Sequence, residues 1–428
     1  MNKFSNFTNT KSAFMSQYNI FRYKEIINLF KKNDNFVIRG NGTSYSDLSL
    51  NNNGNVILTK NLNKILLFDY KKKIIKCQSG LIIKELLQII LKRNLFLHST
   101  PGTYRASIGG LIATDAHGKN VNKSFFSDSL ISIKILTPKN KIIECSRNHN
   151  KDLFFSTIGG FGLTGIILEA EFKLLSIPSL LIEKKTTKFN NIDQMQGIMD
   201  NFKLKYDYIY TIHNTNKFKL DQGFVIGGRF IKSKHNSLKF NNFFNFSIFK
   251  LPIINKLSVQ IFNLILHAIK IKKNSLKTVD IINFFYPLEK FRNWENLYGK
   301  NGFFEFQVFV PKKNFKLFFE SLLNNKNLYK NFSFLSSTKF ISKSEGYFSS
   351  KNESAYNFAI DLLNNKYLKE NYKTLIKIAK KFDSQINIHK DILIQSNSVF
   401  ISKKDLNNFK KNLNLRVINS DFSKRVAI

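Results

Sequence analysis

Residues 100–120 limit what this chain can fold into more than any other stretch. They hold four glycines, a proline and a histidine among small hydroxyl residues, which leaves few side chains for ordinary core packing. Gly102 follows Pro101 and predicts a tight turn with positive φ, and Gly109 and Gly110 let the backbone approach another group closely because neither has a Cβ. A surface turn explains a single glycine pair. Glycines that alternate with hydroxyls and a histidine favour a cradle for a ligand.

Two further glycine clusters lie on either side of this stretch. Residues 36–38 predict a strand, and residues 39–46 continue it as a loop, Arg-Gly-Asn-Gly-Thr-Ser-Tyr-Ser, whose successive amides can form a nest for an anion such as phosphate. Residues 159–165 contain Gly-x-Gly-x-x-Gly, but the dinucleotide fingerprint requires a helix after it, and residues 166–172 alternate like a strand. We therefore reject a Rossmann site and group this cluster with the other two.

The length and charge of the chain leave its partner open. A chain of 428 residues is long enough for about two domains. Its net charge of +38 suggests a nucleic-acid partner, yet the lysines are spread along the chain beside many Asn, Phe and Ile residues, a mixture that AT-rich codons also produce. No nucleic-acid motif surrounds the lysine pairs, so we expect no nucleic-acid partner.

Cysteines, histidines and apolar windows indicate the compartment. Cys77 and Cys145 are too few for a disulfide framework, which fits a reducing, cytoplasmic compartment, and the histidines show no metal-ligand spacing, so we expect no metal. Residues 1–11 lack the apolar run of a secretory signal. Residues 251–271 are the most apolar window, but polar and charged residues interrupt it. They predict an amphipathic helix that packs on its own domain or rests on a membrane surface.

Apolar periodicity predicts a chain of mixed helices and strands. Helical spacing covers residues 83–93, 315–323 and 367–382, and strand patterns cover 56–58, 65–68, 74–78, 132–136, 141–145, 208–212, 223–227, 304–310 and 356–361. Within residues 304–310, Glu305 and Gln307 fall on the face opposite Phe306 and Val308. Pro178 marks a domain boundary, because glycines become sparse after it.

A series of motifs, in order along nearly the whole chain, carries a resemblance to a known family. They are residues 39–47, 101–120 with its His-Gly-Lys-Asn, 159–167, 284–288, Trp294 with 297–299, 306–311, Asn357 with Asp361, and Lys390 with Asp391. The ordered set resembles the flavin-dependent oxidases of the vanillyl-alcohol-oxidase superfamily, which have a PCMH-type FAD domain. Within it, the chain is most similar to the branch that oxidises polyprenyl-phosphate pentoses.

The resemblance implies an α+β fold. Residues 1–178 would form a PCMH-type FAD-binding domain of two α+β subdomains. Residues 179–384 would form a substrate domain with a mostly antiparallel sheet flanked by helices. Residues 385–428 would return to the FAD domain.

The resemblance also implies site residues around a non-covalent FAD. The cofactor would be held by Arg39, Gly40, Asn41, Gly42, Thr43, Ser44, Tyr45, Gly102, Thr103, Ser107, Ile108, Gly109, Gly110, Thr114, Asp115, Ala116, His117, Gly118 and Ile167. The catalytic and substrate residues would be Lys390, His117, Gln307, Asn357, Lys339 and Tyr286, with Lys390 as the cation near the flavin. The ordinary alternative is that Lys390 is one more exposed lysine and that Gln307 and Asn357 are polar residues on a sheet surface.

Three positions depart from the family pattern. Thr43 stands where relatives with covalent flavin carry a histidine, so FAD should dissociate. Ala359 replaces a cysteine of the actinobacterial members, which removes thiol chemistry there. Asn387 replaces a tyrosine close to the flavin, which alters the details of that contact.

Three hypotheses follow for the function. The first is an FAD-dependent oxidoreductase that oxidises a secondary alcohol of a polyprenyl-phosphate pentose to a 2′-ketone, with a short-chain reductase partner and a peripheral contact at the inner face of the cell membrane. The second keeps FAD but acts on a soluble alditol or aldonolactone. The third is a non-enzymatic basic protein that binds nucleic acid or an anionic membrane.

Overall fold

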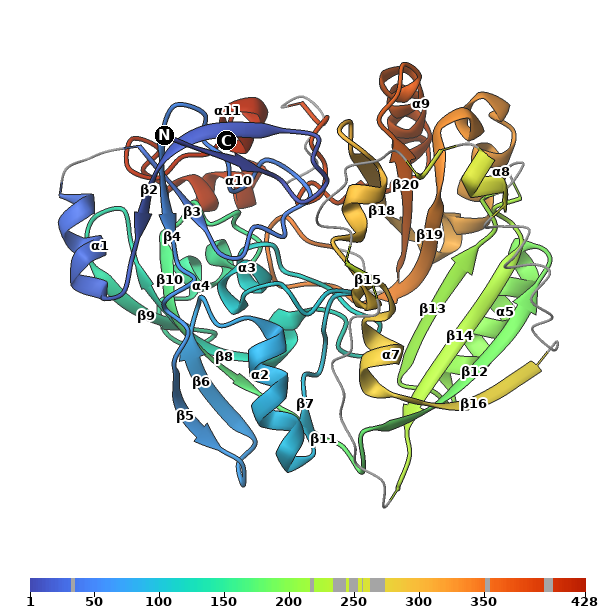
Figure 1. Ribbon diagram of the computed structural model, residues 1–428, viewed down its shortest axis with the longest axis horizontal. Coiled ribbons are helices and arrows are strands. Elements are labelled where there is room, and N and C mark those ends of the chain that lie inside the picture. The colour runs from blue at the N-terminus through green and yellow to red at the C-terminus, as the bar shows by residue number, and fades with distance from the viewer. Residues whose placement is uncertain are drawn as a thin grey trace.

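A computed structural model describes residues 1–31, 35–215, 219–233, 244–245, 253–255, 257–261, 274–350, 355–395 and 403–428 of the chain. These residues form an N-terminal half with two sheets and a second half built on one large sheet (Figure 1). Strands of the large sheet pair antiparallel throughout the described register, so the predicted α+β class with a mostly antiparallel second sheet is confirmed.

The first sheet of the N-terminal half is small, and three of its strands run parallel. Its order is β1 (Asn2–Ser5), β2 (Ser12–Asn19), β4 (Asn55–Leu58) and β3 (Phe36–Arg39), and helix α1 (Tyr23–Phe30) lies between β2 and β3 in the chain. Parallel strands β2, β4 and β3 bury apolar side chains such as Met15, Val37 and Val56. The first glycine loop therefore follows a strand, β3, that is paired and buried.

The second sheet of the N-terminal half is antiparallel. Its order is β5 (Ile65–Asp69), β6 (Ile74–Gln78), β10 (Ile166–Lys173), β8 (Leu130–Leu136) and β9 (Ile142–Ser146). Helices α2 (Ile83–Ile90), α3 (Ile108–Ala113) and α4 (Lys151–Thr157) belong to the same half. Leu86 of α2, Ile112 of α3 and Phe154 of α4 share one core with Ile133 of β8, which explains why these helices stay on the sheet.

The large sheet of the second half has eight strands. Its order is β16 (Asn274–Asp280), β12 (Leu181–Phe189), β14 (Gly223–Phe230), β13 (Tyr208–His213), β19 (Phe332–Ile341), β20 (Ala355–Leu363), β18 (Phe303–Pro311) and β21 (Gln385–Ile386). Helices α5 (Ile192–Lys203), α8 (Phe315–Leu323) and α9 (Leu368–Lys381) cover the face away from the N-terminal half (Figure 1). Phe306 and Phe358 pack under them, which leaves Glu305 and Gln307 on the other face, as alternation predicts.

The last residues of the chain return to the N-terminal half. Helix α10 (Lys403–Lys410) contacts α4, and helix α11 (Asp421–Val426) follows a segment that pairs with β3. There the Phe36 amide donates to the Val417 carbonyl, and the Asn419 amide donates to the Phe36 carbonyl, both at 2.8 Å. Figure 1 shows the two chain ends side by side at this sheet. The limits 1–178, 179–384 and 385–428 remain predictions, and β21 at the start of the last segment pairs with β18 of the large sheet.

Short elements complete the described chain. They are the strand pairs β7 (Leu95–Phe96) with β11 (Leu175–Ser176) and β15 (Phe244–Asn245) with β17 (Phe291–Arg292), helix α7 (Ile281–Phe285), and 3-10 turns at Leu91–Arg93, Phe126–Ser129, Pro287–Lys290, Trp294–Leu297, Lys312–Asn314 and Lys326–Asn331. The predicted helix 315–323 is confirmed over its full length, and the predicted helix 367–382 differs by one residue at each end.

Residues 100–120 contain one helix that was not predicted and one prediction that is wrong. Residues 108–113 form helix α3, although the glycines in this stretch give no helical pattern. The helix begins at Ser107, which caps it and accepts a hydrogen bond from the Gly110 amide. The predicted positive φ at Gly102 is wrong, and an added Cβ there would meet open space. Gly102 therefore needs no glycine-specific backbone conformation.

Most of the predicted amphipathic segment 251–271 lies outside the described residues. Within the segment, residues 257–261 are described and are helical. Among the helices that the structure describes, none combines the length and apolar character that crossing a bilayer requires.

Candidate functional site

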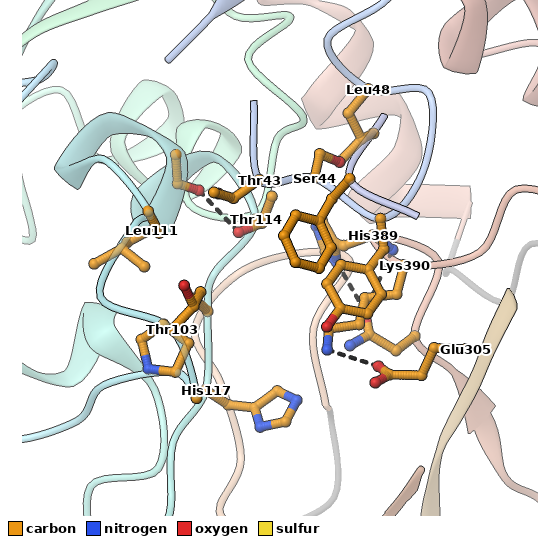
Figure 2. A pocket seen from close by; sticks show the side chains of 18 of the residues that line it. Thr43, Ser44, Leu48, Thr103, Leu111, Thr114, His117, Glu305, His389 and Lys390 are labelled. Carbon is orange, nitrogen blue, oxygen red and sulfur yellow. Dashed lines mark hydrogen bonds and ion pairs between the residues drawn. The ribbon is translucent and has the colours of Figure 1, made fainter. Parts of the chain in front are cut away.

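A cavity of about 540 Å³ lies where the three glycine clusters meet the uncovered face of the large sheet (Figure 2). One wall comes from the N-terminal half and is rich in backbone and small side chains, with His117 and Lys119 among its larger polar side chains. The other wall carries polar and charged side chains from β18, β19, β20 and the loop after β21. Its volume is within the range of cofactor and small-molecule sites. The three clusters, which are far apart in the sequence, thus line one cavity.

The first glycine loop presents its backbone to this cavity. Residues 40–45 all line it, and in the described part of the chain none of their amides donates a hydrogen bond to another residue. Gly42 has φ of +70°, and a Cβ at Gly40 would lie 2.2 Å from Ser107 Oγ. Unpaired amides beside glycines suit an anion that comes close to the backbone.

Arg39 anchors this loop from behind. Its guanidinium donates to the Ser5 carbonyl at 2.8 Å and to Ser49 Oγ at 2.9 Å, and it does not line the cavity. Burial lowers the pKa of Arg39 to about 10, which still leaves it charged at neutral pH. The arginine therefore shapes the loop and leaves anion contact to the amides.

Helix α3 forms the middle of the same wall. Gly109 packs on Ser79, which directly follows β6. A Cβ added at position 109 would lie 2.9 Å from the Ser79 Cβ, so this glycine permits a close contact between α3 and the end of that strand. Gly110 and Thr114 line the cavity on the same helix, and Thr114 Oγ1 donates to the Gly110 carbonyl at 2.8 Å. The helix presents small residues where a planar ring could lie against backbone.

The third glycine cluster closes the wall beside the loop after β21. The Gly159 carbonyl lies 2.8 Å from His389 Nε2, which ties the cluster to that loop. Gly165 lies against the Leu136 carbonyl, which would be 2.4 Å from an added Cβ. Gly162, Gly165 and Ile167 line the cavity. These contacts explain the glycines without a Rossmann site, as the sequence predicts.

The opposite wall is a grid of side chains set by strand register. In β18 and β20, Glu305 is paired with Asp361, Gln307 with Ala359, and Phe309 with Asn357. Asn357 is also paired with Lys339 of β19. Alternation places these residues on one face. A carboxyl pair, an amide and a lysine thus share one surface.

Hydrogen bonds join part of this grid into a chain. Lys390 Nζ lies 2.6 Å from Glu305 Oε1, which also accepts from Gln307 Nε2 at 3.3 Å. Gln307 Oε1 accepts from Asn387 Nδ2 and lies 3.1 Å from His117 Nε2, so the imidazole donates through Nε2. His117 Nδ1 is then an acceptor, and it is buried without a hydrogen-bond partner.

Burial and neighbouring charges set the protonation of the basic groups. Burial, with the charges of Lys339 and Lys390, lowers the pKa of His117 well below its usual value, so the imidazole is neutral. Burial and the Lys390 charge lower the pKa of Lys339 to about 8. Burial also lowers the pKa of Lys119, whose Nζ donates to the carbonyls of Phe284 and Phe285, each at 2.9 Å.

Most of the predicted site residues line the cavity. They are Gly40, Asn41, Gly42, Thr43, Ser44, Tyr45, Gly102, Thr103, Ser107, Gly109, Gly110, Thr114, Ala116, His117, Ile167, Gln307, Lys339 and Lys390. The roles assigned to them remain predictions. The structure brings them together from both halves of the molecule.

The other predicted residues lie behind the walls. Besides Arg39, Ile108 is in the core, and Asp115 accepts hydrogen bonds from Ser127 Oγ at 2.6 Å and from the Ser344 hydroxyl. The Gly118 amide donates to a carbonyl at 2.8 Å, and the Tyr286 hydroxyl lies 2.7 Å from Thr100 Oγ1. Asn357 is fully buried, with both amide atoms unpartnered.

Sequence reasoning missed three charged residues of the site. Lys119 lines the cavity within the very stretch that the sequence singles out, and its Nζ lies 4.6 Å from the centre of the Tyr210 ring. Glu305 and Asp361 also line it. Alternation in residues 304–310 places Glu305 on the same face as Gln307, and this pattern could have identified Glu305 as a site residue.

The site fits a flavin dinucleotide in its donors and its volume. The loop 40–45 offers amides to a pyrophosphate, and small residues of α3 border the cavity. The unpartnered Nδ1 of His117, which lines the cavity, is a buried polar atom that needs a partner the described residues do not supply. Among the described residues, no group of three or more His, Cys, Asp or Glu could hold a metal ion.

Comparison with known proteins agrees with this geometry. The model of a family described as an FAD binding domain matches residues 22–146. A decaprenylphosphoryl-beta-D-ribose oxidase of Mycolicibacterium smegmatis is 26% identical over 64% of this chain and 63% of its own length. An L-galactono-1,4-lactone dehydrogenase of Oryza sativa subsp. japonica is 29% identical over 40% of this chain and 29% of its own. An L-gulonolactone oxidase of Bos taurus is 23% identical over 48% of this chain and 47% of its own length. The chain thus spans less than two thirds of each relative.

Proposed function

We propose that this chain, in which residues 22–146 form an FAD-binding domain of the PCMH type, is an FAD-dependent oxidoreductase acting on CH–OH groups. One observation carries the proposal. A loop of unpaired amides and a wall of connected Lys, Glu, Gln and His side chains face each other across one cavity. The first suits the pyrophosphate of FAD and the second suits a hydroxylated substrate.

The residues divide the work of such an oxidation. FAD, when bound, supplies the acceptor for a hydride from the alcohol carbon. The loop 40–45 would hold the pyrophosphate, and α3 would border the ring system. Gln307 and Lys390 would orient the hydroxyl that loses its proton, because both stand in the hydrogen-bonded chain at the sheet.

We propose a secondary alcohol of a polyprenyl-phosphate pentose as the substrate, which would become a 2′-ketone. Lys119, Lys339 and Lys390 all line the cavity, and a cluster of lysine side chains favours a substrate with a phosphate. The similarity to the decaprenylphosphoryl-beta-D-ribose oxidase supports the same choice. The keto product would need a reductase to complete an epimerisation, and we propose a short-chain reductase as that partner. A peripheral contact with the cytoplasmic membrane face belongs to the same proposal.

A soluble aldonolactone is the second candidate. The similarity to an L-galactono-1,4-lactone dehydrogenase and an L-gulonolactone oxidase favours it. A lactone ring with several hydroxyls could use Gln307 and Asn387, which both line the cavity, without any phosphate.

The cofactor spectrum is the first test. Purified protein should show flavin absorption bands and should release FAD on acid precipitation, because Thr43 offers no side chain for a histidyl link. A folded, colourless protein that takes up no FAD would contradict the proposal. Flavin that stays with the precipitate would contradict only its non-covalent part.

Anaerobic mixing then separates the two substrates. A short-chain polyprenylphosphoryl-β-D-ribose should bleach the flavin bands, and L-galactono-1,4-lactone should not. The reverse result would establish the lactone as substrate.

A further inference from the structure

Two carboxyl groups face each other in the sheet wall of the cavity. Glu305 of β18 and Asp361 of β20 are direct partners in the antiparallel register, and both line the cavity. Side chains in such positions have Cβ atoms about 4.5–5.5 Å apart. The side chain of Glu305 is 12% exposed and Asp361 is 2% exposed, so water screens their charges poorly. Two carboxyl groups on paired positions of a secluded site disfavour ionisation of both.

The surroundings decide which carboxyl keeps the proton. Asp361 accepts a hydrogen bond from the Tyr298 hydroxyl at 3.1 Å, and burial together with the Glu305 charge raises the pKa of Asp361 well above its usual range. Glu305 contacts the Lys390 ammonium at 2.6 Å, and the charge of Lys339 also acts on this pair. Asp361 is therefore the neutral member and Glu305 the carboxylate.

One oxygen of Glu305 remains for a ligand. Lys390 and Gln307 both contact Oε1, and within the described residues no donor contacts Oε2. The Tyr45 ring holds the other side of Lys390, with Nζ 4.5 Å from the ring centre. Figure 2 shows Glu305 and Lys390 together on one side of the cavity, with His117 nearby on a different segment. The carboxylate is thus fixed in direction before a substrate arrives.

We propose that Glu305 is the catalytic proton acceptor of the oxidation, an assignment that rests on the proposed function. The substrate O–H bond breaks and its proton passes to Glu305 Oε2. The electron pair of that bond forms the C=O bond, and the hydride of the same carbon leaves to the FAD named above. Atoms and electrons balance, and Glu305 ends as a neutral acid next to neutral Asp361.

His117 is the competing acceptor because its Nδ1 is unpartnered. A proton there would create an imidazolium in a buried position close to Lys339 and Lys390, which burial disfavours. A proton on Glu305 instead neutralises an existing charge and creates no new one. The cavity therefore selects the carboxylate over the imidazole.

The test compares Glu305→Gln with Glu305→Asp. The first variant keeps size and hydrogen bonding but loses the base, and kcat should fall about 100-fold or more, with KM changing less. Wild-type kcat should rise with pH on the acid side, a rise that Glu305→Gln abolishes and Glu305→Asp retains. Glu320→Gln, at an exposed position of α8, removes one negative charge as a matched control. A Glu305→Gln variant with more than a tenth of wild-type kcat and an intact acid-side rise would overturn the proposal.

Infrared spectroscopy provides a readout that needs no turnover. The difference spectrum between wild type and Asp361→Asn should show the C=O stretch of a protonated carboxyl group, and its absence would overturn the neutral state of Asp361. Every variant is first checked for bound FAD by its absorption spectrum. Wild type that binds no FAD overturns the proposed function and this assignment together, whereas FAD-loaded Glu305→Gln that works normally overturns the assignment of Glu305 alone.

Discussion

The two walls of the cavity offer different atoms to a ligand. The N-terminal wall presents the backbone amides of residues 40–45 and the small residues of α3, while the sheet wall presents charged ends such as those of Lys339, Lys390 and Glu305. A contact to a backbone amide tolerates a change of side chain as long as the new side chain does not fill the space of the ligand. A contact to a charged side chain tolerates a change in the shape of that side chain as long as its charge stays. The comparison separates what binds a cofactor from what acts on a substrate.

Arg425 of α11 joins the two regions, and its loss should have the largest effect on stability. Its guanidinium donates to both oxygens of Asp47, at 2.7 and 3.2 Å, and to the carbonyl of Asp391 at 3.0 Å. Asp47 is fully buried at the end of the first glycine loop, and Asp391 follows Lys390. Arg425→Met should lower the free energy of unfolding by about 1.5–3 kcal/mol, because Asp47 loses two charge-assisted hydrogen bonds while it keeps its ion pair with Lys11 at 3.0 Å.

Denaturant unfolding of FAD-free protein measures this loss. Lys404→Met, at an exposed position of α10, is the matched control for loss of one positive charge. The control should change stability by about 0–1 kcal/mol. Equal effects of the two variants would show that Arg425 does not link the walls.

Gly40→Ala tests the backbone wall. The added Cβ would lie 2.2 Å from Ser107 Oγ, so either the loop moves or the cap of α3 breaks. Steric insertion of this kind costs about 1–3 kcal/mol, which should weaken FAD binding by about 10-fold or more. Titration of apoprotein with FAD, followed by flavin fluorescence, measures the change.

Gly197→Ala is the control for this substitution, because a Cβ on that glycine of α5 meets no atom within 4 Å. FAD affinity should stay at the wild-type value in the control. Unchanged affinity in Gly40→Ala would remove the argument that empty space at this loop matters.

Lys339→Met tests the side-chain wall. An interaction between an ammonium and an anionic substrate contributes about 1.5–3 kcal/mol, so substrate affinity should fall about 10-fold to 100-fold while FAD affinity stays. Lys343→Met, at an exposed position, should leave both affinities unchanged. A loss of FAD affinity equal to the loss of substrate affinity would contradict the division between the walls.

The pH dependence of substrate binding should show the smallest effect. Burial lowers the pKa of Lys339 from 10.5 to about 8 in the folded protein, so this lysine loses its charge as the pH rises through about 8. Binding of an anionic substrate should therefore weaken with rising pH in this window, and Lys339→Met should remove that component. The same lowered pKa makes the folded state gain stability between about pH 8 and 10.5, since the unfolded chain still binds the proton there. Equilibrium binding at several pH values checks the first statement.

Several features could be predicted because they depend on neighbours in the sequence. Alternation in residues 304–310 placed Glu305 and Gln307 on one face, and the strand at residues 166–172 excluded a Rossmann site; β18 and β10 confirm both. Helix 315–323 was predicted to its ends. Helix α3 was missed because its glycines carry no helical pattern, and its stability comes from the Ser107 cap and the core contacts of Ile108 and Ile112.

By itself, the sequence determined the fold class, the glycine loops and the residue types available to a site, because turn chemistry and strand alternation act over a few residues. Only the tertiary structure decided that Glu305 lies beside Asp361, that Lys390 contacts Glu305, and that His117 donates to Gln307 and keeps a free Nδ1. Those contacts join residues up to 190 positions apart. Register and packing across the whole sheet set such distances, and protonation follows from the resulting burial and charge.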